Sequence, residues 1–297
     1  MLLYYCYKEA FSTKGRDFNI FKTPYGKEYL HIKEALHSLM VEIDQIPYEQ
    51  VYTQSYDGLK LAARYYHTKD GAPLEIMFHG YRSSGLVDFC GGTKLALRKG
   101  HNVLVVDQRA HGLSEGKHLT FGAMEKYDCL TWINYAINRF GKDARIFLLG
   151  TSMGAATVLL ASGLNLPENV VGIIADSPYA RAEDIIKKVI ADRMLPPKIT
   201  YPLVNAAAKL YMKCDLKEAD VCAAVKHSDT PILLIHGEED IFVPCQMSKQ
   251  ILDAAPKGER ITFPSAGHVM SYMADPIRYE KEINSFMGKC MEKAGVI

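Results

Sequence analysis

The chain has 297 residues, of which 48% are hydrophobic, 23% charged and 10% aromatic. This balance is typical of a globular protein and excludes disordered, collagenous and fibrous classes. The 35 basic residues nearly cancel the 34 acidic residues and leave a formal charge of +1. A chain without a basic excess lacks the field that gathers phosphates, so we expect no nucleic-acid partner.

The seven cysteines are odd in number and widely spaced, and none stands in a C-x-x-C or Cys/His pattern suited to zinc. Unpaired thiols of this kind are typical of a reducing compartment, so we expect a cytoplasmic protein. No sequence feature indicates a metal, a nucleotide or another cofactor. The apolar residues 1–7 are followed at once by charged residues, so we expect them to pack on the fold, without stable membrane insertion.

Helix-period and strand-period segments alternate from about residue 50 onward. Before that point, apolar residues at three- and four-residue spacing predict a helix over 31–43, within an N-terminal helical segment 1–48 that packs on the core. An antiparallel hairpin is predicted over 51–67, with its turn at Asp57-Gly58. Further strands are predicted at 74–78, 103–106, 146–149, 170–175, 232–235 and 260–263, with helices at 87–99, 124–140, 153–162, within 180–226, 247–255 and 276–291.

The regular alternation of strands and helices predicts an α/β fold, with a mostly parallel twisted sheet of about eight strands and helices on both faces. Ligands bind such sheets at the carboxyl ends of the strands. We expect this domain to cover residues 49–297, with an insertion of helices at about 178–230.

A candidate nucleophile follows the strand predicted at 146–149. The run Gly150-Thr151-Ser152-Met153-Gly154 stands between that strand and a helix-forming segment. A sharp turn of this kind lifts one hydroxyl above the sheet, and the flanking glycines prevent collisions between side chains. The helix that begins here directs free N–H groups at developing negative charge. We therefore predict that Ser152 is the nucleophile of an acyl-transfer reaction.

A serine hydroxyl needs a histidine to take its proton and an acid to orient that histidine. His268 lies in a loop between the last predicted strand and the last predicted helix, and Asp240 follows the strand at 232–235. Their order after Ser152 is that of the serine, acid and histidine in this class of fold. Three further carboxylates remain alternatives for the acid: Glu238, Glu239 and Asp176.

Two backbone donors are needed to stabilise an oxyanion. One is the N–H of the residue after the nucleophile, Met153, and the second comes from the loop after an early strand. That loop holds Gly80, which lets the backbone approach a substrate, and the N–H of Tyr81 is our predicted second donor.

The sequence resembles the α/β-hydrolases, and in particular the serine-hydrolase branch of small esterases and acyl-peptide-hydrolase-like domains. The resemblance covers residues 49–293 and rests on five ordered motifs: His79-Gly80-Tyr81, the run 107–114 (DQRAHGLS), Gly150 to Gly154, the run 236–244 (HGEEDIFVP) and Gly267-His268. In this family the run 107–114 lies near the nucleophile without being catalytic. One departure is Ala110, where the pattern usually has glycine, and we expect it to affect the chemistry little.

The resemblance also implies a variable helical cap between residues 177 and 230, which we expect to cover an acyl pocket, and the helix at 31–43 could add a wall. Apolar and aromatic residues in the cap and in loops near the triad predict the lining of this pocket: Phe89, Tyr179, Met194, Phe242 and Met270. An uncharged pocket favours carboxylic esters of short-to-medium acyl chains or small aromatic acids. A serine peptidase of the aminopeptidase or acylaminoacyl type, or an acyltransferase on the same triad, remains an alternative. The expected partner is thus a small-molecule ester.

Overall fold

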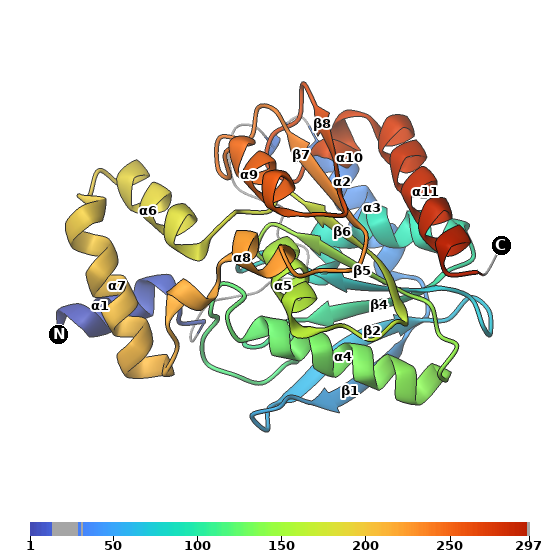
Figure 1. Ribbon diagram of the computed structural model, residues 1–297, viewed down its shortest axis with the longest axis horizontal. Helices are drawn as coiled ribbons and strands as arrows, with labels where there is room; N and C mark the ends of the chain where they lie inside the picture. Colours follow the sequence, from blue (N-terminus) through green and yellow to red (C-terminus); the bar gives the residue numbers. More distant parts are fainter. Residues whose placement is uncertain (14–28, 31, 296–297) are drawn as a thin grey trace.

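A single eight-stranded sheet runs through the protein in this computed structural model, which describes residues 1–13, 29–30 and 32–295. The strand order is β1-β2-β4-β3-β5-β6-β7-β8 (Figure 1). β2 is antiparallel to β1 and β4, and all other neighbours are parallel. The strands are β1 Glu49–Gln54, β2 Lys60–Tyr66, β3 Leu74–Phe78, β4 Asn102–Asp107, β5 Ile146–Thr151, β6 Val170–Asp176, β7 Ile232–Gly237 and β8 Gly258–Phe263. The predicted mostly parallel sheet is confirmed.

Helices cover both faces of the sheet. Successive side chains of β3 point to opposite faces of the sheet. Met77 packs under the helices of one face and Ile76 under those of the other. The first face carries α2 Lys33–Asp44, α3 Gly85–Arg98, α10 Ser271–Ala274 and α11 Pro276–Lys293. The second face carries α4 Glu125–Phe140, α5 Met153–Ala161, α8 Val221–Val225 and α9 Gln246–Ala254. The central strands are therefore buried on both sides, as their unbroken apolar runs predict.

A lobe of three helices lies beside the sheet (Figure 1). It consists of α1 Leu2–Ala10, α6 Ala182–Asp192 and α7 Pro197–Met212. The rings of Tyr7 and Tyr211 are 5.1 Å apart where α1 packs along α7. Short 3₁₀ turns also occur, at η2 Ser162–Leu164 after α5 and at η3 Leu216–Glu218 before α8. The N-terminal helix thus joins the lobe although about 200 residues separate it from α7 in the chain.

The predicted helix at 31–43 is found as α2, one residue further along the chain at its C-terminal end. Residue 31 and the rest of the N-terminal segment at 14–28 lie outside the described residues. The long stretch at 180–226 divides into α6, α7, η3 and α8. Its first break follows from Pro196 and Pro197, since proline removes a helical N–H donor and suits the first position of the next helix.

Residues 107–114 form a tight loop after β4, and contacts with neighbouring side chains account for its conformation. The guanidinium of Arg109 lies buried, with its Nε 2.6 Å from Asp128 Oδ2 and its Nη1 3.1 Å from Asp57 Oδ2. A Cβ placed on Gly112, at φ +51°, would lie 2.2 Å from an oxygen of Asp107. Ala110 adopts φ +63°, a conformation that costs an L-residue about 1–2 kcal/mol and that glycine adopts freely.

The strain at Ala110 predicts that Ala110→Gly stabilises the protein. We expect the free energy of unfolding to rise by roughly 0.5–1 kcal/mol, because the relief of strain exceeds the added entropy of the unfolded chain. Urea unfolding measures this change. Ala294→Gly serves as the control because Ala294 has φ −81°, so the same substitution there should not stabilise the protein. A less stable Ala110→Gly protein would contradict the argument.

Candidate active site

Ser152 stands in a sharp turn between β5 and α5, with φ +51° and ψ −113°. Two glycines make this turn possible. A Cβ on Gly154 would lie 1.8 Å from Phe78 O, and one on Gly150 would lie 2.3 Å from Gly154 O. The Ser152 N–H donates to Asp176 O at 2.8 Å, which ties the turn to the end of β6. The backbone therefore holds the Ser152 hydroxyl at the carboxyl end of the sheet in a conformation that serine rarely adopts.

Three side chains form a continuous hydrogen-bonded relay at this edge. His268 Nε2 lies 3.0 Å from Ser152 Oγ, and His268 Nδ1 lies 2.7 Å from Asp240 Oδ2. The other oxygen of Asp240 accepts from the backbone N–H groups of Phe242 at 2.9 Å and Val243 at 2.7 Å. The structure thus brings the predicted nucleophile, base and acid into one hydrogen-bonded chain, from the ends of β5, β7 and β8.

His236 is a further contact of Asp240 that the sequence analysis did not assign. Its Nε2 lies 3.3 Å from Asp240 Oδ2 and 2.9 Å from Val243 O. Burial alone would raise the pKa of the Asp240 carboxyl, but the hydrogen bonds from His236 and His268 outweigh burial and hold this pKa well below its usual range. Asp240 is therefore a stable carboxylate at neutral pH. Its four-residue spacing from His236 in the motif 236–244 was the available signal.

The other three carboxylates have different partners. Glu238 accepts a hydrogen bond from Thr262 Oγ1 at the surface, at 2.6 Å, and Glu239 is exposed. Asp176 accepts from Ser177 Oγ at 3.1 Å and from Tyr279 OH at 3.2 Å. Of the four candidate acids, Asp240 is the one hydrogen-bonded to His268.

The loop of residues 79–84, which we call the Gly80 loop, lies beside Ser152 and is held by the Asp88 carboxylate. Asp88 accepts from Gly80 N at 2.6 Å, Ser83 Oγ at 2.5 Å and Thr151 Oγ1 at 3.0 Å. A Cβ on Gly80 would lie 3.3 Å from Ser152 Cβ, so the absence of a side chain there lets the two turns approach. Asp88 thus joins the Gly80 loop to the end of β5.

A buried histidine holds the same loop from its other side. The Arg82 N–H donates to His111 Nε2 at 3.2 Å, and His111 Nδ1 lies 2.9 Å from Arg109 O. Burial lowers the pKa of His111 to about 3, with the neighbouring His79 acting in the same direction. A neutral imidazole can accept the Arg82 N–H bond at physiological pH, so His111 supports the loop without adding charge.

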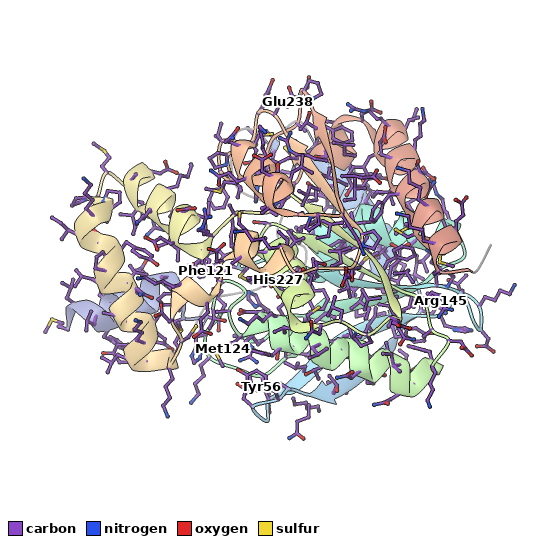
Figure 2. All side chains as sticks on the ribbon, in the orientation of Figure 1. Tyr56, Phe121, Met124, Arg145, His227 and Glu238 are labelled. Atoms are coloured by element: carbon purple, nitrogen blue, oxygen red, sulfur yellow. The ribbon has the colours of Figure 1, made fainter. Side chains whose placement is uncertain are left out.

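Helix α1 is fastened to the Gly80 loop. Tyr81 OH donates to Ala10 O at 2.9 Å, and Arg82 Nη2 donates to Glu9 O at 2.7 Å. These side chains satisfy carbonyl groups in the last turn of α1 that lack helical partners. The Tyr81 ring also stacks on Phe121 at 5.3 Å, and Figure 2 labels Phe121 where the lobe meets the sheet.

Comparisons with known proteins agree with this architecture. Residues 76–208 match the family described as alpha/beta hydrolase fold. YqkD of Bacillus subtilis, an uncharacterized protein, is 29% identical over 195 residues, which are 65% of this chain and 64% of YqkD. The chain has the α/β-hydrolase fold.

Two solved structures show the same fold. The Pyrococcus furiosus esterase Pf2001 superposes with a TM-score of 0.68 at 22% identity, over 84% of this chain and 92% of the esterase. A putative aryl esterase from Burkholderia cenocepacia superposes with a TM-score of 0.60 at 17% identity, over 82% of this chain and the whole of that protein. At these identities the likeness concerns the fold.

A cavity of about 550 Å³ opens beside Ser152. Phe89, Phe242 and Met270 of the predicted pocket residues line it. Ile32 and Leu36, at the start of α2 and within it, add a wall. The cavity therefore lies on the face of the sheet that carries α2, α3 and α11.

The expectation that the cap covers this pocket is not met, because none of the described residues from 178 to 230 lines the cavity. Tyr179 is buried at the junction of the lobe and the sheet, where its OH donates to Phe121 O at 2.9 Å. Met194 lies between α6 and α7 and is 94% exposed. Both side chains are apolar enough for a pocket, but α6 and α7 pack with α1 in the lobe beside the sheet.

Among residues 1–13, 29–30 and 32–295, no group of three His, Cys, Asp or Glu side chains is placed to hold a metal ion. The seven cysteines are all free thiols. No helix in the described part of the chain combines the length and hydropathy that a membrane span needs.

The buried Asp176 carboxyl makes the stability of the protein depend on pH. Burial raises its pKa to about 6, against the opposing effects of His236 and of the hydrogen bonds from Ser177 and Tyr279. Because the folded state binds the proton more tightly than the unfolded state, this group stabilises the fold below about pH 4 and loses that contribution as pH rises to about 6.

We therefore expect Asp176→Asn to flatten the pH dependence of unfolding between about pH 4 and 6. The difference from wild type should change by about 2 kcal/mol across that interval. Urea unfolding at each pH measures it, and Asp143→Asn on the exposed surface should leave the wild-type slope. An Asp176→Asn protein with the wild-type slope would show that Asp176 does not titrate as described.

Proposed function

We propose that the protein is a serine hydrolase that cleaves carboxylic esters of short-to-medium acyl chains or small aromatic acids. The observation that carries the proposal is the relay Ser152–His268–Asp240, with contacts of 3.0 and 2.7 Å. The Pyrococcus and Burkholderia neighbours, described as an esterase and a putative aryl esterase, support the same class of reaction.

In the first half of the proposed reaction, His268 Nε2 takes the proton of Ser152 as its Oγ attacks the ester carbonyl. Asp240 holds the imidazole in the tautomer that carries a proton on Nδ1 and stabilises the imidazolium that forms. The proton then passes from His268 to the leaving alkoxide, and an acyl-enzyme remains on Ser152. In the second half, His268 activates water, which attacks the acyl-enzyme and releases the acid.

The oxyanion is assigned to two backbone N–H groups, those of Met153 and Tyr81. Met153 is the first residue of α5, where N–H groups have no partner within the helix and the helix dipole favours negative charge. Tyr81 lies in the Gly80 loop, whose backbone is held by Asp88 and His111. Donors fixed in advance in this way need little reorganisation in the transition state.

The proposal predicts which substitutions abolish turnover. Ser152→Ala and His268→Ala should remove nearly all activity, and Asp240→Asn should lower the rate by about 10⁴-fold because it offers the wrong hydrogen-bonding pattern to His268. The measurement is hydrolysis of p-nitrophenyl esters from acetyl to palmitoyl, beside an aminoacyl p-nitroanilide. Ser162→Ala, at another buried serine after α5, should retain wild-type rates.

Ester hydrolysis that persists in Ser152→Ala would overturn the assignment. Activity restricted to the anilide would replace the esterase by a peptidase, and release of acyl groups to an added alcohol in preference to water would indicate an acyltransferase. Circular dichroism and thermal unfolding of each variant show whether the fold is intact.

The link between α1 and the Gly80 loop gives a second prediction. Tyr81→Phe keeps the ring on Phe121 and the backbone N–H but removes the bond to Ala10 O. We expect kcat to fall about 3- to 10-fold with little change in KM, because the oxyanion donor is less well placed while the ring at position 81, which lines the cavity, is retained. Tyr52→Phe, on the edge strand β1, is the matched control. A wild-type kcat for Tyr81→Phe would show that α1 does not position this loop.

A further inference from the structure

The cavity beside Ser152 extends far along the sheet. Its lining includes Ser152 and Thr151 at one end and Glu75 and Lys99 at the other. Glu75 of β3 pairs in register with Phe147 of β5, five residues before Ser152. At about 3.3 Å per residue, this separation corresponds to about 16 Å along the strands. The cavity therefore extends about 16 Å along the strands, and it runs beneath α3, which supplies many of its lining residues.

The middle of this cavity is apolar. Val87 and Leu95 line it from α3, Leu149 from the sheet, and Met270 and Ile283 from the C-terminal helices and the loop before them. A passage with apolar walls fits a hydrocarbon chain, since burial of each methylene contributes about 0.8 kcal/mol. The shape and the lining together favour an unbranched acyl chain whose carbonyl lies at Ser152.

Two adjacent glycines in α3 keep this passage open. Gly91 and Gly92 lie inside the helix, where each costs about 1 kcal/mol relative to alanine. A Cβ on Gly91 would lie 2.4 Å from Tyr272 Cε1, and one on Gly92 would lie 3.2 Å from Phe89 Cδ1. Both glycines line the cavity, so side chains at these positions would narrow it near its middle.

The far end of the cavity is a buried ion pair. Lys99 Nζ lies 2.9 Å from Glu75 Oε1, and His101 Nδ1 lies 2.8 Å from the same oxygen. Burial would raise the pKa of Glu75, but the contacts with His101 and Lys99 outweigh burial and hold this pKa below its usual value. Glu75 is therefore ionised, although its side chain is only 2% exposed.

This ion pair retains hydrogen-bonding capacity. An ammonium group has three donors, and Lys99 directs two of them to Glu75 Oε1 and Met287 Sδ among the described residues. Glu75 Oε2 accepts no hydrogen bond from a described residue. A terminal methyl group placed here would leave the third N–H of Lys99 and Oε2 of Glu75 without a polar partner, whereas a hydroxyl could accept from Lys99 and donate to Glu75. A carboxylate would meet the negative charge of Glu75.

We propose that the cavity is an acyl tunnel that selects esters of unbranched ω-hydroxy fatty acids, with the chain beneath α3 and the terminal hydroxyl on Lys99 and Glu75. The inference rests on the proposed function of Ser152, and it names the substrate class for that site.

The first experiment compares chain ends at constant length. The substrates are the p-nitrophenyl esters of dodecanoic, ω-hydroxydodecanoic and dodecanedioic acids, because an extended dodecanoyl chain is close to the length of the tunnel. We expect the hydroxyl-terminated ester to exceed the methyl-terminated ester in kcat/KM by about tenfold, and the carboxylate-terminated ester to be the poorest. Equal rates for the hydroxyl and methyl ends would overturn the proposal.

Two substitutions at the far end of the cavity should have different effects on hydrolysis of the carboxylate-terminated ester. Glu75→Gln removes the negative charge and leaves Lys99, so hydrolysis of the carboxylate-terminated ester should rise while the hydroxyl preference falls. Lys99→Met should remove the hydroxyl preference without improving the carboxylate-terminated ester. Hydrolysis of p-nitrophenyl acetate, which does not reach this end, should stay within about twofold of wild type in both. If a substitution lowered hydrolysis of all three twelve-carbon esters to the same extent, Glu75 and Lys99 would have a structural role only.

A third substitution blocks the tunnel at its middle. Gly92→Leu should lower kcat/KM for the dodecanoyl esters at least tenfold and leave the acetyl ester unchanged. The matched control is Gly288→Leu inside α11, where a Cβ has nothing within 4 Å and which lies outside the lining. Undiminished dodecanoyl hydrolysis by Gly92→Leu would show that the chain does not lie beneath α3.

Binding separates failure of the tunnel from failure of the proposed function. Ser152→Ala protein is titrated calorimetrically with the methyl esters of dodecanoic and ω-hydroxydodecanoic acids. Tighter binding of the hydroxy ester supports the tunnel even if wild type hydrolyses no ester, in which case the proposed function fails alone. Equal or absent binding of the two esters overturns the tunnel, whatever the activity at Ser152.

Discussion

The backbone of Ser152, held at φ +51°, is the constraint on which the rest of the structure depends. Its turn brings Gly154 so close to Phe78 O that no side chain fits between them. The ends of β3 and β5 and the start of α5 are therefore locked together, and the Gly80 loop, which continues from β3, lies against Ser152 as a result. The strained residue persists because three buried elements determine its position together.

The polar groups around this turn are fixed by one another. Asp88 holds the Gly80 loop through three hydrogen bonds, and the neutral His111 holds the loop from the opposite side. Asp240 is held as an anion by two backbone N–H groups and two imidazoles. A site built in this way has its dipoles oriented before any substrate enters, which is the arrangement that lowers the electrostatic cost of acyl transfer.

The sheet and the hydrogen-bonded relay could be predicted from sequence because their signals are local. Strands buried on both faces have unbroken apolar runs, and the turn at Ser152 requires glycine at fixed positions beside it. Asp240 and His268 could be predicted because each follows a strand whose carboxyl end lies at the same edge.

The location of the pocket could not be predicted in the same way. The spacing of Leu36 and Met40 predicts a helix with an apolar face, but it does not say which surface that face covers. The predicted cap likewise contains Tyr179 and Met194. Residues of these types occur in pockets, in cores and in exposed loops, so their identity does not decide where they lie. Which helices surround a cavity depends on packing between segments far apart in the chain, and single-residue patterns carry little information about such contacts.

The docking of α1 has a consequence for the order in which the protein is assembled during synthesis. The first helix emerges before the other elements, yet its partners are Tyr81 and Arg82 and, much later, Tyr211 on α7. Contacts across so long an interval of chain form late, because the intervening loop must first be closed. During synthesis α1 therefore lacks its partner helix until the chain has been made as far as Met212, the end of α7.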